Sequence, residues 1–352
     1  ILFLQLESFF DPTLVKYLDI SEDPIPTFRK LMEDYSSGYY KVPSVGAGTA
    51  NTEFESITGM SMHYFGPGEY PYKTILKQTD CESIADDLSQ IGYGTHVVHN
   101  NTATFYSRNN AFSMMGFDTF TSKECMNISQ YTPNGNWPTD DVLVQETVKA
   151  MNATENQSDF VYTITVEGHG DYPTEKLLEN PDILVSGAAD EASNNQWEYY
   201  VNMIHEVDDF IGDLITAVDR RGEDTIIVFF GDHLPTMGLT DADMKSGDIF
   251  KTKYITWNNM GLAKKDADLT AYQLLAHITD QAGIHEGTMF RYHQSEMNAG
   301  VSTDDASYLT NWKLLQYDLL YGDRYSYHGV DKYPASDLVM GVQDVVIDHT
   351  SM

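Results

Sequence analysis

Acidic and histidine side chains follow four short apolar runs that are typical of buried strands; they are Glu7, His99, His169 and the adjacent pair Asp232 and His233. Each of them alone is more often a turn cap or a structural histidine than a functional group. Together, the two carboxylates and the imidazole of Glu7, Asp232 and His233 would suit a divalent cation such as Mn²⁺, with Mg²⁺ or Zn²⁺ fitting less well. The sequence therefore predicts a metal site wherever the fold joins these strand ends.

The segment 46–55, Gly-Ala-Gly-Thr-Ala-Asn-Thr-Glu-Phe-Glu, has the pattern of a glycine loop that enters a helix. Thr49 would lie at the helix N-terminus, where free N–H groups favour a phosphate oxygen. A purely structural alternative makes Thr49 an N-cap. A protonated hydroxyl attacks phosphorus poorly, and coordination to a metal lowers its pKa without a separate base. Thr49 is therefore a candidate nucleophile.

The elements that must position these residues alternate between strand and helix patterns. We expect strands at 1–6, 93–99, 159–166, 225–230 and 252–257, and helices at 27–35, 83–91, 194–221 and 269–282. This alternation predicts an α/β fold with a mostly parallel central sheet and helices on both faces. Ligands of such sheets bind beyond the carboxyl ends of the strands, where all four sites above are expected.

The pattern loosens after about residue 300 into sequence rich in Tyr and Asp. We therefore expect a catalytic domain over residues 1–300 and a C-terminal extension, 301–352, that packs on the same domain. The chain begins at Ile1 inside an apolar run and without an initiator Met, so we expect a piece of a longer protein. No run of about 18 apolar residues is present that would span a membrane.

The charge of the chain excludes some partners. The sequence has 21 Lys and Arg against 53 Asp and Glu, a formal net charge of -32. Binding to nucleic acid needs clustered cations to neutralise phosphates, and no such cluster is found, so no nucleic acid partner is expected. Unaided docking on an anionic membrane is disfavoured for the same reason. Cys81 and Cys125 form no metal-binding pattern, and whether they pair stays open.

Three motifs together resemble the lipoteichoic acid synthase family, within the wider sulfatase and alkaline phosphatase superfamily. They are Glu7 in Leu-Glu-Ser-Phe, Thr49 in Gly-Thr-Ala-Asn-Thr-Glu-Phe-Glu, and 231–235, Gly-Asp-His-Leu-Pro. The resemblance runs in the same order from Ile1 to about Ile284 and implies the extracellular catalytic domain of such an enzyme. Residue 234 is Leu where some relatives have Tyr, so that contact is not carried over.

The resemblance assigns roles to individual residues. It implies a metal, Mn²⁺ with Mg²⁺ as the alternative, held by Glu7, Thr49, Asp232 and His233. It implies Thr49 as nucleophile and His169 as the acid that protonates the leaving group. The substrate-binding residues that it implies are His99, Tyr106, Arg108 and His169. Tyr106 stands where a Trp is familiar in the family, and Arg108 is suited to holding a nonbridging phosphate oxygen.

The implied reaction transfers glycerophosphate from phosphatidylglycerol to a growing polyglycerolphosphate (lipoteichoic acid) chain or a glycolipid anchor. A glycerophosphoryl group would be held on Thr49 between the two halves, and diacylglycerol would be released. Family members carry N-terminal transmembrane helices, which implies a place on the outer face of a cell membrane, in a Gram-positive bacterium. The alternatives are a phosphoethanolamine transferase, a phosphodiesterase, a sulfatase or, more remotely, a non-catalytic polymer-binding ectodomain.

Overall fold

A computed structural model describes residues 1–154 and 156–342 of the chain. Its centre is a nine-stranded sheet. In spatial order the strands are β10 (Leu269–Thr270), β3 (Ser37–Lys41), β9 (Lys251–Asn258), β8 (Ile226–Gly231), β1 (Leu2–Leu6), β6 (Asp159–Ile164), β4 (Gly94–His99), β5 (Thr119–Thr121) and β11 (Val339–Met340). A separate antiparallel pair joins β2 (Asp19–Ile20) to β7 (Val185–Ser186).

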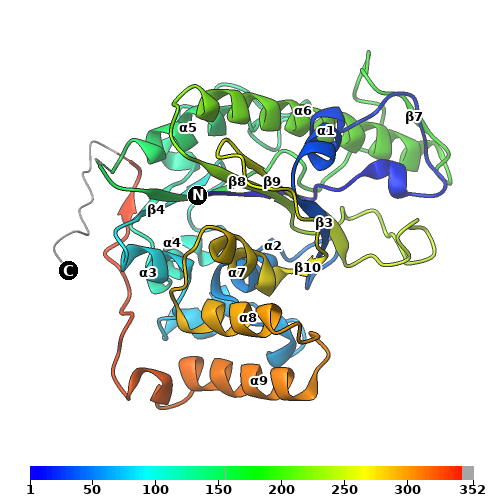
Figure 1. Cartoon of the computed structure of the whole chain (residues 1–352). Coiled ribbons are helices and arrows are strands. Elements are labelled where there is room, and N and C mark those ends of the chain that lie inside the picture. The colour runs from blue at the N-terminus through cyan, green and yellow to red at the C-terminus, as the bar shows by residue number, and fades with distance from the viewer. Residues whose placement is uncertain (155, 343–352) are drawn as a thin grey trace.

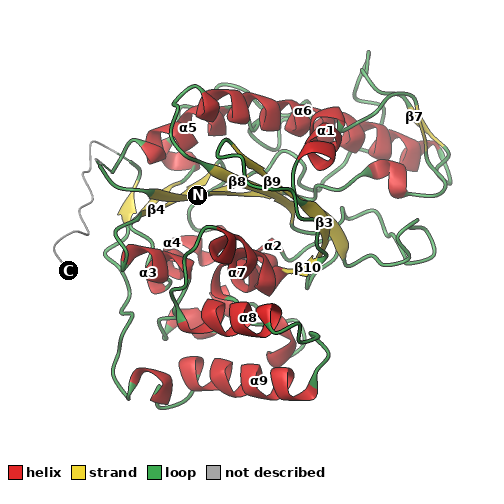
Figure 2. Ribbon diagram, viewed as in Figure 1, coloured by secondary structure: helices red, strands yellow, loops and turns green. Residues whose placement is uncertain are grey.

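The sheet is mostly parallel, and helices cover both of its faces (Figure 1). Its antiparallel pairings join β9 to β8 and to β3. Figure 2 shows one helical layer above the strands and a deeper stack below them. The upper layer holds α1 (Pro26–Asp34), α5 (Val142–Met151) and α6 (Glu191–Asp219). The lower stack holds α2 (Thr49–Thr58), α3 (Ile84–Ser89), α4 (Arg108–Met114), α7 (Ala271–Gln281), α8 (Thr288–Asn298) and α9 (Ala306–Leu320). The predicted fold class is confirmed.

Alternation along the central strand divides its side chains between two hydrophobic cores. In β1, Phe3 packs with Tyr162 and Phe230 on one face, whereas Leu2 and Leu4 belong to the core on the other face. All five residues of β1 are buried. Full burial stabilises each of the four apolar side chains by about 1.5–3 kcal/mol, so the strand is anchored from both sides. This anchoring makes its carboxyl end a rigid support for the residues that follow.

The expected elements are present with shifted ends. The long helix begins at Glu191 rather than 194, because Asp190 caps it by accepting from the Ser193 N–H at 2.8 Å. The last expected helix loses its first two residues to β10, and α7 begins after the Thr270 capping box. Short 3₁₀ turns lie in the connections, at Pro12–Leu14, Met62–Tyr64, Pro71–Lys73, Ile75–Lys77, Phe105–Ser107, Lys123–Cys125 and Tyr325–Tyr327.

Helix α9 packs against the far end of the helix that carries Thr49. The Trp312 indole N–H donates to the Gly59 carbonyl at 3.1 Å, and the Gln316 side chain forms hydrogen bonds with the Ser61 backbone.

The division into a catalytic domain and a C-terminal extension at residue 300 stays a prediction. The last ten residues of that extension, 343–352, lie outside the described part of the chain. Cys81 and Cys125 are both free thiols. Among the described residues, no helix is long and apolar enough to cross a membrane.

Candidate active site

The parallel register of β1 and β8 brings two of the predicted residues side by side. Leu6 pairs with Gly231, so Glu7 and Asp232 leave the sheet at the same level. The Asp232 carboxylate accepts from the Ser8 N–H at 2.8 Å, which ties the two loops together. A Cβ on Gly231 would lie 1.9 Å from the Phe9 carbonyl oxygen, so only glycine permits this close crossing.

Glu7, Asp232 and His233 form a buried cluster whose ligating atoms all lie within 4.8 Å of one another. The His233 Nε2 atom is 3.6 Å from Glu7 Oε1 and 3.4 Å from Asp232 Oδ2. Asp232 Oδ2 is buried without a hydrogen-bond partner. In the described part of the chain, no other group of three His, Cys, Asp or Glu residues meets this geometry. The structure therefore joins the three residues as the sequence predicts.

The chemistry of these atoms fits a divalent cation. His233 Nδ1 lies 2.9 Å from the Leu234 carbonyl oxygen, which can only accept, so the proton belongs on Nδ1 and the Nε2 lone pair is free for a metal. Two carboxylates and one imidazole nitrogen form a donor set that Mn²⁺ accepts. The unpartnered Asp232 Oδ2 gives such an ion a ligand that nothing else in the fold uses.

The ionisable groups of the cluster perturb one another strongly. Burial acts to raise the pKa of Glu7, but the charges of His233 and His169 and the hydroxyls of Ser8 and Thr49 outweigh it and lower that pKa. Burial and the charge of Glu7 raise the pKa of Asp232 to about 7. Burial acts to lower the pKa of His233, but Asp232 and Glu7 raise it above its ordinary value. The buried cluster thus stabilises positive charge.

Thr49 is the first residue of α2, and its hydroxyl reaches the cluster. Thr49 Oγ1 donates to Glu7 Oε2 at 3.0 Å and lies 3.4 Å from His233 Nε2. The N-cap of this helix is Gly48, with a φ of 99° and no side-chain cap hydrogen bond. The alternative that Thr49 is the N-cap is therefore wrong. The hydroxyl stands at an uncapped helix N-terminus beside two carboxylates, where a phosphate and a metal would both be stabilised.

Thr49 also lines a hollow of about 400 Å³. Its lining includes Glu7, Thr49 and His233, and also Tyr106 and His169. Non-glycine residues with positive φ gather in the same lining: Ser8 at 53°, Tyr106 at 57° and Asp171 at 77°. Such conformations cost free energy and persist where the surroundings impose them, which is frequent at functional sites.

The other predicted substrate-binding residues supply nitrogen atoms that have no partner. His99 Nε2, Arg108 Nη1 and His169 Nδ1 are all buried without a hydrogen bond. Burial and the nearby charge of Arg108 lower the pKa of His99 well below its ordinary value. His99 and Arg108 do not line the hollow but are buried, with exposed fractions of 2% and 1%. Contrary to the expectation of a simple phosphate contact, most of the Arg108 guanidinium is already paired with Glu53.

Two residues near the site were not singled out from the sequence. Glu53 pairs with Arg108, and its position one helical turn after Thr49 is the signal that could have identified it. Trp137 packs its ring 4.3 Å from the His169 ring and donates to the Gly170 carbonyl at 3.0 Å. Trp137 lies in a loop without periodicity, so no sequence pattern indicated its place.

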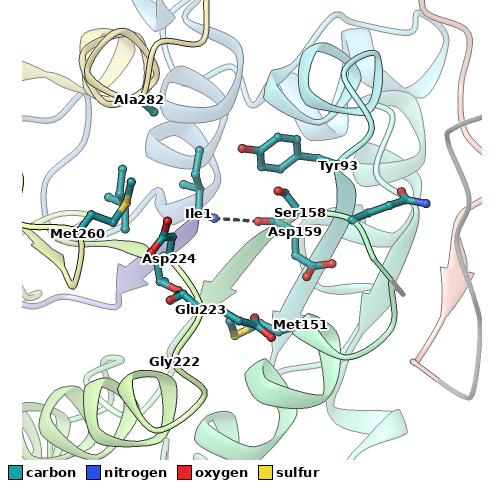
Figure 3. A pocket seen from close by; sticks show the side chains of 13 residues that line it. Ile1, Tyr93, Met151, Ser158, Asp159, Gly222, Glu223, Asp224, Met260 and Ala282 are labelled. Carbon is teal, nitrogen blue, oxygen red and sulfur yellow. Dashed lines mark hydrogen bonds between the residues drawn. The ribbon is translucent and has the colours of Figure 1, made fainter.

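A larger hollow, of about 610 Å³, lies at the other end of the strands from Glu7 and Asp232, and Figure 3 shows its lining. It surrounds the amino ends of the strands, where the Ile1 amino group donates to the Asp159 carbonyl at 2.8 Å. Its lining contains acidic residues such as Glu223 and Asp224, but no histidine. Ligands of parallel sheets bind at the carboxyl ends of the strands, so the smaller hollow at Thr49 is the candidate active site.

Comparison with known proteins agrees with this fold. Residues 1–284 match the sulfatase family. A Rhizobium meliloti (strain 1021) protein named for cyclic beta-1,2-glucan modification is 29% identical over 363 residues, covering 93% of this chain and 55% of that protein. Lipoteichoic acid synthase of Staphylococcus saprophyticus is 22% identical over 242 residues, covering 65% of this chain and 35% of the synthase. The chain therefore spans about half or less of these curated relatives.

Two solved structures share the fold at low sequence identity. The phosphoglycerol transferase GacH of Streptococcus pyogenes, in complex with sn-glycerol-1-phosphate, has a TM-score of 0.81 at 20% identity and covers 93% of this chain and 87% of its own. The lipoteichoic acid synthase LtaP of Listeria monocytogenes has a TM-score of 0.64 at 20% identity and covers 82% of this chain and 74% of its own.

Proposed function

The chain belongs to the sulfatase family of enzymes, and on that premise we propose that it is a metal-dependent phosphoglycerol transferase. Its donor substrate is phosphatidylglycerol, and its acceptor is a hydroxyl group of a polyglycerolphosphate chain or a glycolipid. We further propose that the protein acts at the outer face of a cell membrane, where a phospholipid donor is available. The fold shared with GacH, which was solved with sn-glycerol-1-phosphate, supports glycerophosphate as the transferred group.

The single observation that carries the proposal is the position of the Thr49 hydroxyl. It donates to Glu7 and lies 3.4 Å from His233 Nε2, and all three residues line the hollow. Asp232, in the same cluster, has a carboxylate oxygen without a partner. Glu7, Thr49, Asp232 and His233 would hold the metal, Mn²⁺ or Mg²⁺. The bound ion would supply positive charge that lowers the pKa of the hydroxyl and neutralises phosphate charge.

In the first half of the reaction, Thr49 Oγ1 passes its proton to Glu7 Oε2, to which it donates at 3.0 Å, and forms a bond to phosphorus while the bond from phosphorus to the diacylglycerol oxygen breaks. His169 lines the hollow and donates a proton to the departing oxygen, so diacylglycerol leaves as a neutral alcohol. Arg108 holds the phosphate through Nη1, which has no partner in the protein. His99 Nδ1 donates to the Ile164 carbonyl, so its unprotonated Nε2 accepts a hydrogen bond from a glycerol hydroxyl of the substrate. The bound metal and Arg108 would attract the anionic lipid locally, despite a net charge of -32.

In the second half, a hydroxyl oxygen of the acceptor attacks phosphorus, the bond to Thr49 Oγ1 breaks, and Thr49 Oγ1 takes its proton back from Glu7. The proton of the acceptor hydroxyl passes to His169, which returns to its starting state. Because the two halves share one intermediate, the glycerophosphoryl group remains on Thr49 when no acceptor is present.

A saccharide hydroxyl is a second candidate acceptor. The relative that covers 93% of this chain is named for modification of cyclic beta-1,2-glucan. We therefore include a neutral glucan as acceptor beside the polyglycerolphosphate chain. An experiment can distinguish the two acceptors. Each acceptor is supplied separately to the protein loaded with phosphatidylglycerol, and the masses of the products are measured by mass spectrometry.

The test of the proposed function uses fluorescent phosphatidylglycerol with Mn²⁺. We expect release of diacylglycerol far faster than from phosphatidylethanolamine, and one glycerophosphoryl group on the peptide that contains Thr49. Thr49→Ala should lose both the adduct and the release, whereas Thr49→Ser should retain part of each because the hydroxyl remains. Equal rates on the two lipids would favour a phosphoethanolamine transferase. A folded Thr49→Ala protein with wild-type release would refute the mechanism.

A further inference from the structure

Arg108 is a fully buried cation held almost entirely by one carboxylate. Its Nη2 atom donates to Glu53 Oε1 at 2.5 Å, and its Nε atom lies 3.2 Å from each Glu53 oxygen. Glu53 and Arg108 have exposed fractions of 0% and 1%. A planar guanidinium bonded along one edge cannot rotate, so its orientation is set by the position of the carboxylate.

The pairing leaves one nitrogen of the guanidinium available. Nη1 is buried and has no hydrogen-bond partner. A buried unsatisfied donor costs about 1–3 kcal/mol, so it is retained where a ligand uses it. The guanidinium carbon lies 5.2 Å from the centre of the Tyr106 ring, and Tyr106 lines the hollow above Thr49. The guanidinium of Arg108 therefore lies next to a residue that lines the hollow at Thr49.

Glu53 lies four residues after Thr49 on α2, on the same side of the helix and one turn further along. The same helix thus carries the attacking hydroxyl at its first turn and the partner of the phosphate-binding cation at its second. All of α2 from Thr49 to Thr58 is buried except Asn51, which is partly buried. The helix is therefore held from every side and can act as a rigid spacer between the two groups.

The carboxylate itself is supported from the central strand. Gln5 on β1 has its amide nitrogen 3.5 Å from Glu53 Oε1, and the Tyr162 hydroxyl donates to Gln5 Oε1 at 2.7 Å. All of these side chains are buried. The chain of contacts runs from the centre of the sheet through Glu53 to Arg108.

We propose that Glu53 is a positioning residue that sets the guanidinium of Arg108 at a fixed distance from the Thr49 hydroxyl, so that one helical turn of α2 matches the nucleophile to the phosphate of the substrate. Glu53 does not touch the reacting atoms; it acts through Arg108. The proposal rests on the proposed function in that Arg108 must contact a phosphate.

The test is a double-mutant cycle with Glu53→Gln and Arg108→Gln. Glu53→Gln keeps one acceptor oxygen and the shape of the side chain but removes the charge that orients the guanidinium. We expect kcat/KM for release of diacylglycerol to fall about tenfold or more, because a displacement of 1 Å at such a site costs up to about 100-fold. In the Arg108→Gln background the same change should have no further effect, since there is no guanidinium to orient.

The matched control is Glu55→Gln, a second buried glutamate of α2 whose carboxylate bonds Ser61 and the Met62 N–H rather than Arg108. It should leave kcat/KM unchanged. Far-UV circular dichroism and thermal unfolding check that each variant is folded. If Glu53→Gln alone is unstable, the comparison of Arg108→Gln with the double variant, which has no unpaired buried charge, still tests whether Glu53 acts only through Arg108. A fall that repeats in the Arg108→Gln background indicates a merely structural role and overturns the proposal, as does wild-type kcat/KM in Glu53→Gln.

Binding of sn-glycerol-1-phosphate, measured by calorimetry with Mn²⁺, separates this proposal from the proposed function. If the wild-type protein binds sn-glycerol-1-phosphate but does not release diacylglycerol, phosphatidylglycerol is not the donor. The double-mutant cycle is then measured from the binding affinities for sn-glycerol-1-phosphate. Affinity should then fall about tenfold in either single variant and no further in the double variant. Equal affinity in wild type and Glu53→Gln, or no binding by the wild type, overturns the role of Glu53.

Discussion

Glu55 should make the stability of this protein depend on pH in a measurable way. Its side chain is 5% exposed, and burial raises its pKa to about 7, against the opposing hydrogen bonds from the Met62 N–H and Ser61. The ordinary pKa of a solvated glutamate, which serves as the value for the unfolded chain, is 4.5. Between these two values the folded state binds the extra proton, so stability is greatest at low pH and is lost as pH rises towards 7.

The size of the effect follows from the two pKa values. One pKa unit corresponds to about 1.4 kcal/mol, so protonation of Glu55 favours the folded state by about 2.5 kcal/mol more at pH 5 than at pH 8. Other buried acids, such as Asp208 with a pKa raised to about 6 by burial, titrate in the same range. A comparison of two variants is therefore needed to isolate Glu55.

The assay is urea unfolding of metal-free wild type and Glu55→Gln at pH 5 and pH 8. Glutamine imitates the protonated acid and can accept the same two hydrogen bonds through its oxygen. The free energy of unfolding of the wild type should fall from pH 5 to pH 8 by about 2.5 kcal/mol more than that of Glu55→Gln. Parallel pH profiles for the two proteins would refute the reasoning, because they would mean that Glu55 has an ordinary pKa in the folded state.

Three further predictions concern the metal cluster and the loop that carries it. Asp232→Asn should weaken Mn²⁺ binding at least about tenfold by calorimetry, since it removes a charge from a ligand whose Oδ2 has no other partner; unchanged affinity would place the metal elsewhere. Chelation should abolish turnover in the wild type and added Mn²⁺ should restore it. Gly231→Ala should destabilise the protein by about 3 kcal/mol or more in urea unfolding, because its Cβ would lie 1.9 Å from the Phe9 carbonyl oxygen; a loss below 1 kcal/mol would contradict this close approach.

The sequence was sufficient for features that depend on local pattern. The apolar run before Glu7 predicts a buried strand, and the glycines before Thr49 predict a loop that enters a helix, because period, burial and glycine placement are read directly from neighbouring residues. The alternation of such elements predicts a parallel sheet, and a parallel sheet predicts that Glu7 and Asp232 meet. The joint prediction is confirmed by the cluster of Glu7, Asp232 and His233.

Tertiary structure alone decided the features that depend on residues far apart in the chain. Nothing near Arg108 indicates that its charge is buried against Glu53, 55 residues earlier. The choice of Gly48 rather than Thr49 as the N-cap frees the hydroxyl for Glu7, 42 residues away. The physical reason is that hydrogen-bond partners and burial are properties of packing between elements, which only the folded register of strands and helices determines. The sequence thus predicted a candidate nucleophile and candidate metal ligands, and the fold determined that Glu53 holds the guanidinium of Arg108.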